Sequence, residues 1–335
     1  MSKPIVLVTS TTVSEAAQSL LRGAGIDIAF MQGPITEKSL ISEFSRQSIT
    51  AVILRGPSPF TPAVFAAAKN LKIIAKYGAG IDSVDLQSAT AGGVAIMVTS
   101  GANADAVAEH SFALMLALAR ELPRFDRELR KGVWKNPHYI VRDFRERTVG
   151  IVGYGQIGRR TARLASNCGA KVVVYSRSRA ELPPEMMWED SLDGLLGRAD
   201  IVSLHCPLTD QTRGMIGQKQ LGLMKPGALL INTSRGKLID EPALIAALKS
   251  GRMAGAGLDT FATEPPDSAN PLFALPNVIC TPHIASSTTG AGAQMGTIAA
   301  NSIISYLRGE IYDRRNLINP HVLERPESRL VTGAL

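Results

Sequence analysis

The sequence predicts an α/β protein with two doubly wound parallel-sheet domains. Two observations lead to this fold class. Short apolar runs alternate with segments of helical spacing along most of the chain, and the alternation pauses in an Ala- and Leu-rich stretch at 104–118 before it starts again at Thr148. Strands that alternate with helices form parallel sheets with right-handed crossovers. A chain of 335 residues is also long enough for two hydrophobic cores.

The first hundred residues predict the first of these sheets. Gly23 ends the first segment of helical spacing, and Gly33-Pro34 marks the turn before the second. We expect strands at 5–9, 26–30, 51–54, 73–76 and 95–98, and helices at 14–22, 36–46 and 62–68.

The second half predicts another sheet of the same kind. We expect strands at 148–153, 171–175, 201–204, 228–232, 256–259 and 278–281, and helices at 158–166, 192–197, 241–250 and 288–307. The long helix at 104–118 would join the two lobes. We therefore expect a discontinuous domain made of residues 1–100 and 290–335, with a second domain, 101–289, inserted into it.

Composition excludes several classes of protein. The hydrophobic content of 45% and the charged content of 19% are ordinary for a globular protein. No apolar run approaches the roughly 18 residues of a membrane span, and the N-terminus does not resemble a signal peptide. The cysteines Cys168, Cys206 and Cys280 are widely spaced, which favours a reducing cytoplasm and argues against a disulfide framework or a metal site.

The formal charge of +7 does not predict nucleic-acid binding. The densest basic cluster, at 120–135, is interleaved with Glu121, Asp126 and Glu128, which is typical of a solvated helix face. A positive charge that is spread in this way favours attraction of small anions, such as phosphorylated cofactors and carboxylate substrates.

A glycine-rich loop follows the strand expected at 148–153. Its sequence is Gly153-Tyr154-Gly155-Gln156-Ile157-Gly158, and it opens the next helix. Gly153 permits a tight turn, Gly155 lets the backbone approach a pyrophosphate, and Gly158 allows close packing of helix on strand. The N–H groups at the start of the helix, including those of Gln156 and Ile157, favour an anion. In this context the motif predicts a Rossmann domain that binds a dinucleotide.

The end of the next strand bears on which dinucleotide is bound. NAD-binding folds place a carboxylate there for the ribose hydroxyls, but this chain has Ser176-Arg177-Ser178. An arginine can bind a 2′-phosphate in a bidentate manner, and the serine hydroxyls can donate hydrogen bonds to it. These residues favour NADP. The alternative is an exposed basic turn in a protein that uses either NADP or NAD.

Three later loops each place an ionisable residue just after an expected strand. They carry Arg235, Glu264 and His283. Open α/β sheets bind ligands at the carboxyl ends of their strands, so the three residues are candidates for one site.

Together these motifs resemble the D-isomer-specific 2-hydroxyacid dehydrogenase family, which includes glyoxylate/hydroxypyruvate reductases. The resemblance covers nearly the whole chain and extends to four further motifs: 76–82 (KYGAGID), 107–110 (VAEH), 205–208 (HCPL) and 224–227 (MKPG). It implies a flavodoxin-like substrate domain around the inserted Rossmann cofactor domain, with a closing cleft between the two and hinges near 100–103 and 285–289.

The resemblance also implies a role for each member of the charged trio. Arg235 would bind the carboxylate of a 2-oxo acid and polarise its keto oxygen. His283 would be the acid/base that gives a proton to that oxygen. Glu264 would pair with His283, favour its protonated form and fix its orientation. Formate dehydrogenases of the family generally have Gln at the Glu264 position, so Glu264 argues against that activity.

Further residues are assigned by the same resemblance. Asp259 would anchor the nicotinamide amide, and the cofactor wall would include Thr233, Cys206, Pro207 and Thr212. The substrate carboxylate would contact backbone N–H groups at Tyr77, Gly78, Ala79 and Gly80. Arg55 either meets a second anionic group of the substrate or lies on the surface. We expect His110 to be a packing residue and His205 to line the cofactor cleft.

The expected reaction is the NADPH-dependent reduction of glyoxylate or hydroxypyruvate by a homodimer, with contacts through an arm around Gly132-Val133-Trp134. Two alternatives stay open. One is a dinucleotide-sensing regulator, because transcriptional co-repressors share this fold family. The other is a dehydrogenase of phosphoglycerate or phosphite.

Overall fold

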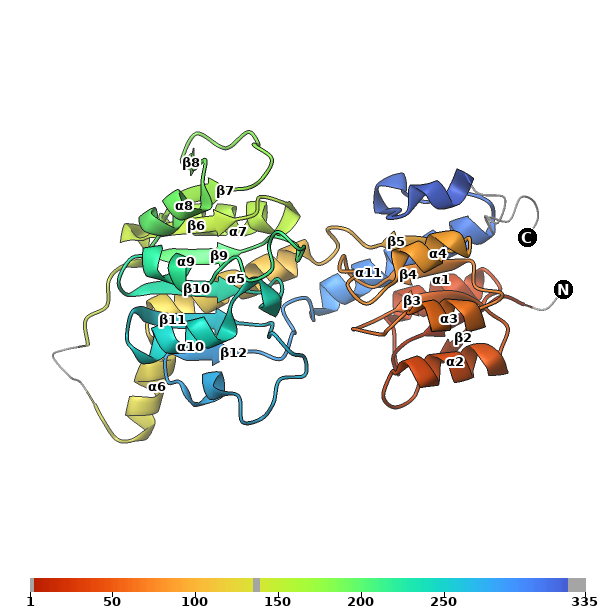
Figure 1. Cartoon of the computed structure of the whole chain (residues 1–335), viewed down its shortest axis with the longest axis horizontal. Coiled ribbons are helices and arrows are strands. Elements are labelled where there is room, and N and C mark those ends of the chain that lie inside the picture. Colours follow the sequence, from red (N-terminus) through yellow and green to blue (C-terminus); the bar gives the residue numbers. More distant parts are fainter. Residues whose placement is uncertain (1–2, 135–138, 325–335) are drawn as a thin grey trace. The chain divides into compact units, whose positions relative to one another are not determined.

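The computed structural model describes residues 3–134 and 139–324. The chain divides into two compact units. Unit 1 consists of Met1–Asn103 and Thr288–Leu335, and unit 2 of Ala104–Ser287 (Figure 1). Each unit has its own sheet.

Unit 1 contains a five-stranded sheet in which neighbouring strands run parallel. Its strands are β1 (Ile5–Val8), β2 (Asp27–Phe30), β3 (Ile49–Leu54), β4 (Ile73–Lys76) and β5 (Ala95–Val98), and its helices are α1 (Glu15–Gly23), α2 (Glu37–Arg46), α3 (Pro62–Ala67), α4 (Leu86–Ala91) and α11 (Thr289–Leu307). The strand order β2-β1-β3-β4-β5 is that of flavodoxin-like sheets.

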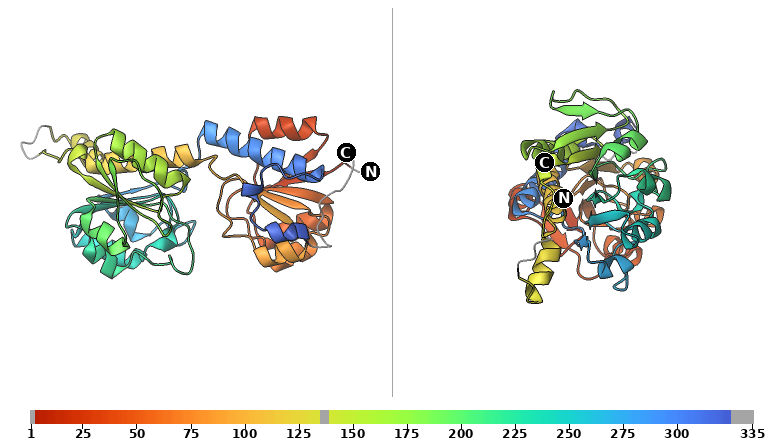
Figure 2. Two further views of the ribbon diagram at one scale, coloured as in Figure 1. Left: turned by 90° about the horizontal axis from the view of Figure 1, so that it is seen from above. Right: turned by 90° about the vertical axis from the view of Figure 1, so that its left-hand side faces the viewer.

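Helices cover both faces of this sheet (Figure 2). α1 and α11 pack on one face through residues such as Leu21 and Ile303, and α2, α3 and α4 pack on the other through Leu40, Val64 and Ala89. Because both faces are covered, β4 and β5 are buried at every position, and apart from Lys76 at the end of β4 their residues are apolar.

Unit 2 contains a seven-stranded sheet, again with parallel neighbours. Its strands are β6 (Thr148–Val152), β7 (Lys171–Tyr175), β8 (Met186–Trp188), β9 (Ile201–Leu204), β10 (Ala228–Asn232), β11 (Met253–Leu258) and β12 (Val278–Cys280). The order β12-β11-β10-β9-β6-β7-β8 is the Rossmann order with one extra strand beyond the sixth.

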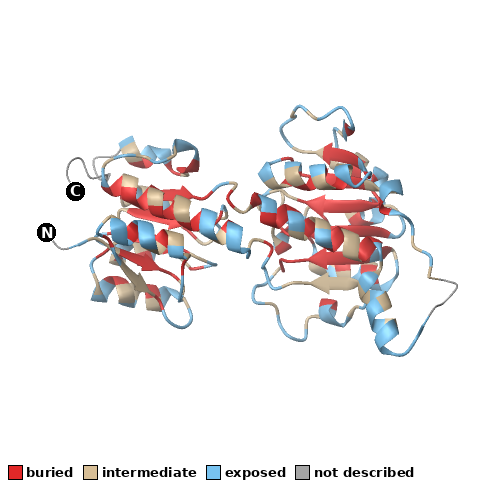
Figure 3. Cartoon of the chain, turned by 180° about the vertical axis from the view of Figure 1, so that it is seen from behind, coloured by how far each residue is buried: buried red, intermediate tan, exposed pale blue. Residues whose placement is uncertain are grey.

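The helices of unit 2 also lie on both faces of its sheet. They are α5 (Ala104–Ala119), α6 (Leu122–Arg130), α7 (Gln156–Asn167), α8 (Leu192–Arg198), α9 (Gln218–Leu223) and α10 (Glu241–Lys249). α5 and α7 form one hydrophobic layer with the sheet, and α8, α9 and α10 form the other. α6 has no buried residue and projects from the unit, as the exposed colouring in Figure 3 shows.

The predicted fold class is confirmed by these two parallel sheets and their strand orders. Two helices, α4 and α9, and one strand, β8, were not among the predicted elements, and α6 was expected only as a solvated helix face within 120–135. β8 has only three residues and α4 and α9 have six each, which is too short for a clear periodic pattern. No helix in the described ranges has the length and apolar character to cross a membrane.

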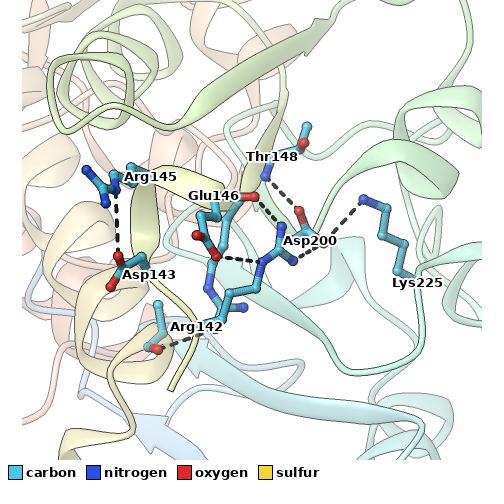
Figure 4. Close-up of polar contacts among 9 residues, drawn as sticks. Arg142, Asp143, Arg145, Glu146, Thr148, Asp200 and Lys225 are labelled. Atoms are coloured by element: carbon cyan, nitrogen blue, oxygen red, sulfur yellow. Dashed lines mark hydrogen bonds and ion pairs between the residues drawn. The ribbon is translucent and has the colours of Figure 1, made fainter. Parts of the chain in front are cut away.

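Asp200 is the centre of a polar cluster at the amino ends of β6, β9 and β10 (Figure 4). Its carboxylate accepts hydrogen bonds from Thr148 N–H at 2.7 Å, Arg142 Nη1 at 3.0 Å and Lys225 Nζ at 3.2 Å. Burial alone would raise the pKa of Asp200, but these three donors outweigh it and hold the pKa below its ordinary value.

Replacing Asp200 by Asn should therefore destabilise unit 2 by about 1–3 kcal/mol, because charged hydrogen bonds are lost at a side chain that is only 11% exposed. Asp200 stabilises the fold fully above the pKa that it has in the unfolded chain. This stabilisation is lost as the pH falls through its lower pKa in the folded protein. D200N should thus lose stability at neutral pH and show a weaker dependence of stability on acid than the wild type. Urea unfolding at several pH values measures both. Asp143→Asn, whose side chain is 60% exposed, is the matched control, and an equal loss in both variants would contradict the prediction.

Candidate active site

The glycine loop has the geometry that dinucleotide binding needs. A Cβ on Gly153, whose φ is +95°, would lie 2.6 Å from the carbonyl oxygen of His205. A Cβ on Gly158 would lie 2.0 Å from the carbonyl oxygen of Gly153, so both positions require glycine. Gly155, in contrast, faces open space, with nothing within 4 Å of an added Cβ. It precedes the first turn of α7, which has no side-chain cap. This open, uncapped helix start fits a pyrophosphate.

The basic turn after β7 presents its arginine to solvent. Ser176 is half-buried, whereas Arg177 and Ser178 are exposed. Arg177 lies close enough to Cys206 to act electrostatically on its thiol, although burial dominates and raises the pKa of Cys206 to about 11. The neighbouring Arg179 is engaged elsewhere: it lies over the Trp188 ring at 5.7 Å and pairs with Asp190 at 3.6 Å.

The loop that carries Arg235 is shaped by the last residue of β10. Asn232 is fully buried, donates to the carbonyl oxygen of Arg235 at 2.8 Å and accepts from Ser234 N–H at 3.0 Å. Gly236, the residue after Arg235, packs directly against the loop that follows β11. A Cβ on Gly236 would lie 1.9 Å from the carbonyl carbon of Phe261. The loops of Arg235 and Glu264 are therefore in direct backbone contact.

Glu264 and His283 form a hydrogen-bonded ion pair. Glu264 Oε2 lies 2.8 Å from His283 Nδ1, and Glu264 Oε1 accepts the N–H of Phe261 at 3.0 Å. The His283 side chain is 48% exposed. With Nδ1 directed at the carboxylate, Nε2 is the ring nitrogen left for a ligand.

The surroundings of Glu264 and His283 favour the charged form of each side chain. The hydrogen bond from Glu264 raises the pKa of His283 above its ordinary value, and this effect exceeds the opposing effect of burial. Burial by itself would raise the pKa of Glu264, but the hydrogen bonds from His283 and Phe261 lower it. Arg235 also acts electrostatically on both groups, so the three side chains lie close together.

His283 is held in an unusual backbone conformation. Its φ is +52°, a region that non-glycine residues seldom adopt. Asp259, which is fully buried at the end of β11, accepts N–H hydrogen bonds from the next two residues, Ile284 and Ala285, each at 2.9 Å. Its Oδ1 also accepts from the Thr281 hydroxyl at 2.6 Å. Asp259 thus fixes the backbone on both sides of His283.

Residues 112–285 match the model of the D-isomer-specific 2-hydroxyacid dehydrogenase NAD-binding domain. The chain belongs to this family.

Its relatives in the 2-hydroxyacid dehydrogenase family include enzymes with different substrates. It is 43% identical to a glyoxylate reductase of Thermococcus litoralis, over 76% of this chain and 79% of that one. It is 36% identical to a D-3-phosphoglycerate dehydrogenase of Archaeoglobus fulgidus over 92% of this chain, but it spans only 58% of that protein's length. The structure of an NADPH-dependent glyoxylate/hydroxypyruvate reductase of Sinorhizobium meliloti, in complex with citrate, is similar with a TM-score of 0.82 at 26% identity, covering 98% and 99% of the two chains.

The residues that the sequence suggested as contacts for the substrate lie in unit 1. Arg55 stacks over the Tyr77 ring at 4.8 Å and donates to the carbonyl oxygen of Thr12. The N–H of Tyr77 is bonded to Leu54 O, and the N–H of Gly78 to Thr99 Oγ1. Both N–H groups therefore already have partners within the unit. Of the four backbone N–H groups expected to contact the substrate carboxylate, those of Ala79 and Gly80 remain as candidates.

The remaining candidates have identifiable contacts in unit 2. The Thr212 hydroxyl donates to Pro207 O at 2.7 Å and closes the loop between them, and Thr233 Oγ1 lies 2.7 Å from Ser111 Oγ. His205 bonds Ser203 through Nε2 at 2.9 Å, and burial lowers its pKa to about 3, so its imidazole is neutral. The described residues contain no cluster of His, Cys, Asp and Glu that is suited to a metal ion.

Interpreting His110 as a packing residue was incomplete. Its Nε2 lies 3.0 Å from Thr281 Oγ1, so it belongs to the polar network of the His283 loop. Two positioning residues were also missed: Asn232 and Glu241. Glu241 accepts from Ala262 N–H at 3.2 Å and from Asn270 Nδ2 at 2.8 Å, which holds the Glu264 loop. A polar residue at the end of an apolar strand was the available signal for Asn232, whereas Glu241 gives no sequence signal beyond helix capping.

Glu264→Gln should move the pH dependence of 2-oxo acid reduction. If His283 is the general acid, reduction requires its protonated form, and the rate would fall as the pH rises through the His283 pKa, which Glu264 raises. Without the carboxylate the pKa of His283 drops, and the falling limb of kcat/KM should shift to lower pH. A pH series of kcat/KM tests this. Glu310→Gln changes an exposed carboxylate in unit 1 and should leave the profile in place. An unshifted profile in E264Q would contradict the pairing.

Proposed function

We propose that this protein reduces a small 2-oxo acid of the glyoxylate or hydroxypyruvate type to the D-2-hydroxy acid with NADPH. The observation that carries the proposal is the 2.8 Å contact of Glu264 with His283 beside Arg235, all three on loops that follow adjacent strands β10, β11 and β12. Ligands of open α/β sheets bind at such strand ends. The glyoxylate reductase relatives support the substrate type.

The side chains have complementary tasks in this reaction. Arg235 binds the substrate carboxylate and polarises the keto oxygen through its planar guanidinium group. His283 gives the proton on Nε2 to the keto oxygen, while Glu264 stabilises the imidazolium before the transfer and fixes its orientation. The bound nicotinamide supplies the hydride that C2 receives. In the reverse direction His283 takes the proton back from the hydroxyl.

The cofactor would lie on unit 2 and part of the substrate on unit 1. We assign residues 101–289 to a dinucleotide-binding domain and residues 1–100 with 290–335 to a substrate domain. The Gly153–Gly158 loop would hold the pyrophosphate, with Cys206, Pro207, Thr212, Thr233 and Asp259 around the nucleotide. Ala79 and Gly80 N–H groups would contact the substrate carboxylate. Arg55 would meet a second anionic group if the substrate carries one.

The NADP preference rests on Arg177, which is exposed at the end of β7 where NAD-binding folds place a carboxylate. Arg177→Ala should raise the KM for NADPH by about tenfold or more, since a charged, bidentate phosphate contact is lost, and should change the KM for NADH much less. Steady-state kinetics with both cofactors measure the two values. Arg179→Ala, which changes an arginine engaged by Trp188 and Asp190, is the matched control. Equal effects of R177A on both cofactors would refute the contact.

The proposed assembly is a homodimer. α6 projects from unit 2 and exposes Leu122 at 55% and Leu129 at 53%, and Trp134 beyond it is 71% exposed. Apolar side chains that gather on a projecting helix and the segment after it favour burial against a second copy of the chain.

A substrate panel tests the proposed activity. Oxidation of NADPH and NADH is followed with glyoxylate, hydroxypyruvate, pyruvate and longer 2-oxo acids, and reduction of NADP⁺ and NAD⁺ with 3-phosphoglycerate and phosphite. The phosphoglycerate arm is included because of relatives such as the Archaeoglobus fulgidus enzyme. Turnover of a small 2-oxo acid supports the proposal. If only 3-phosphoglycerate or phosphite is turned over, the proposed 2-oxo acid substrate is wrong. Tight dinucleotide binding without any turnover would favour a dinucleotide-sensing regulator.

A further inference from the structure

His110 connects helix α5 to the loop that holds His283. Its imidazole is 22% exposed, and its Nε2 lies 3.0 Å from Thr281 Oγ1 and 3.8 Å from Asp259 Oδ1. Thr281 lies just after β12, two residues before His283. The contact therefore joins two segments that are 171 residues apart in the sequence.

The number of available hydrogens fixes the direction of this contact. A threonine hydroxyl has one hydrogen, and that of Thr281 is donated to Asp259 Oδ1 at 2.6 Å. Thr281 Oγ1 must therefore accept from His110, so Nε2 of His110 carries a hydrogen. The result is a directed chain in which His110 donates to Thr281 and Thr281 donates to Asp259.

This chain ends at the backbone of the His283 loop. The Asp259 oxygens accept the N–H groups of Ile284 and Ala285, each at 2.9 Å. His283 itself has a φ of +52°, a conformation that is unfavourable for a residue other than glycine unless its surroundings hold it. The orientation of the Asp259 carboxylate therefore controls whether the His283 loop keeps this conformation.

The neighbouring residue on α5 acts on the other catalytic loop. Ser111 Oγ lies 2.7 Å from the hydroxyl of Thr233, which precedes Arg235 by two residues. Both side chains are buried. α5 thus supplies, from two consecutive residues, one polar contact to the His283 loop and one to the Arg235 loop.

We propose that His110 and Thr281 are positioning residues of the proton-transfer step. His110, through Thr281, orients the Asp259 carboxylate, which in turn holds the loop that presents His283 to the substrate. The proposal rests on the proposed function for its catalytic consequence, whereas the state of the His283 loop can be measured without turnover.

The test compares two variants of His110 that differ only in donor capacity. Gln places an amide N–H near the position of Nε2, whereas Leu fills similar space and donates nothing. His110→Leu should lower kcat by about tenfold, because small misplacements of a catalytic group have effects of this size or larger. His110→Gln should restore kcat to within about threefold of the wild type. Equal impairment by Gln and Leu, or no loss of kcat in H110L, would overturn the proposal.

Thr281 provides an independent pair of variants. Thr281→Val removes the hydroxyl and should resemble H110L, whereas Thr281→Ser keeps the hydroxyl and should resemble the wild type. If the two residues act in one chain, the double variant H110L/T281V should have the kcat of T281V alone. If the fold-losses in kcat of the two single variants multiplied in the double variant, the two residues would not act in a single chain. Should H110L fail to fold, the Val and Ser variants carry the same comparison.

A spectroscopic readout separates this proposal from the proposed activity. The sequence has five histidines, so imidazole carbon labelling gives a small set of NMR signals that His→Asn variants assign. Glu264, Asp259 and Arg235 are the charged groups that act on His283. If H110L releases the loop, the titration midpoint of His283 should fall toward its ordinary value, and it should stay high in H110Q. An unchanged midpoint in H110L would refute the positioning role. A wild-type protein that reduces no 2-oxo acid would refute the activity alone.

Discussion

His283→Asn is expected to lower kcat for 2-oxo acid reduction by about 10²–10⁴-fold, the usual contribution of a positioned general acid. The substitution removes the imidazole, which bonds Glu264 through Nδ1 and leaves Nε2 for a ligand. The amide of Asn cannot deliver a proton at neutral pH. The Kd for NADPH should stay close to that of the wild type, because the glycine loop and the basic turn after β7 are unchanged.

The control for this variant is His321→Asn, in which an imidazole that is 80% exposed at the end of unit 1 is replaced in the same way. H321N should have the kinetics of the wild type. Stopped-flow measurement of a single turnover keeps the chemical step separate from product release. If H283N retains more than about a tenth of the wild-type rate in that measurement, another group supplies the proton.

Gly236→Ala should impair activity and stability together, although residue 236 bears no functional group. The added Cβ would lie 1.9 Å from the carbonyl carbon of Phe261 and 2.5 Å from the nitrogen of Ala262. Backbone atoms cannot yield to it without moving the Arg235 loop away from the Glu264 loop. We expect kcat/KM to fall by about 10²-fold, as for other displacements of about 1 Å in an active site, and the free energy of unfolding to fall by about 1–3 kcal/mol, as for other overpacked sites.

Gly222→Ala is the matched control for this variant. Gly222 lies inside α9, and nothing lies within 4 Å of an added Cβ. Since alanine is favoured over glycine inside a helix, G222A should be neutral or slightly stabilising. Thermal unfolding and steady-state kinetics of both variants measure the contrast. Wild-type kinetics in G236A would show that the two loops move independently.

The sequence predicted the regular part of the fold well where strands are buried on both faces. β4, β5, β7, β9 and β10 have the predicted bounds, because a strand between two helical layers consists mostly of apolar residues. The strand orders of the two sheets confirm the predicted doubly wound fold class. The projecting α6 was expected only as a solvated helix face within 120–135, and its bounds could not be predicted because it has no buried residue.

The candidate site was predictable as a set of residues but not as a set of contacts. Arg235, Glu264 and His283 stand out because each follows a strand, and parallel strands bring their carboxyl ends to one edge. The roles of Asn232, Glu241 and His110 depend on side-chain direction and on which strands are neighbours. The contact of Gly236 with Phe261 likewise arises only once β10 and β11 are paired. Short-range sequence patterns contain none of this information.

The division of unit 1 between the two ends of the chain has a consequence for synthesis on the ribosome. α11 packs against α1, and Asn319 bonds the N–H of Ile96 across 223 residues of sequence. The face of the first sheet that α11 covers therefore stays uncovered until unit 2 has been translated. Unit 2, in contrast, is contiguous from Ala104 to Ser287 and can complete its core as soon as it has emerged. The nascent chain thus exposes, while unit 2 folds, the apolar part of this face that α11 later covers.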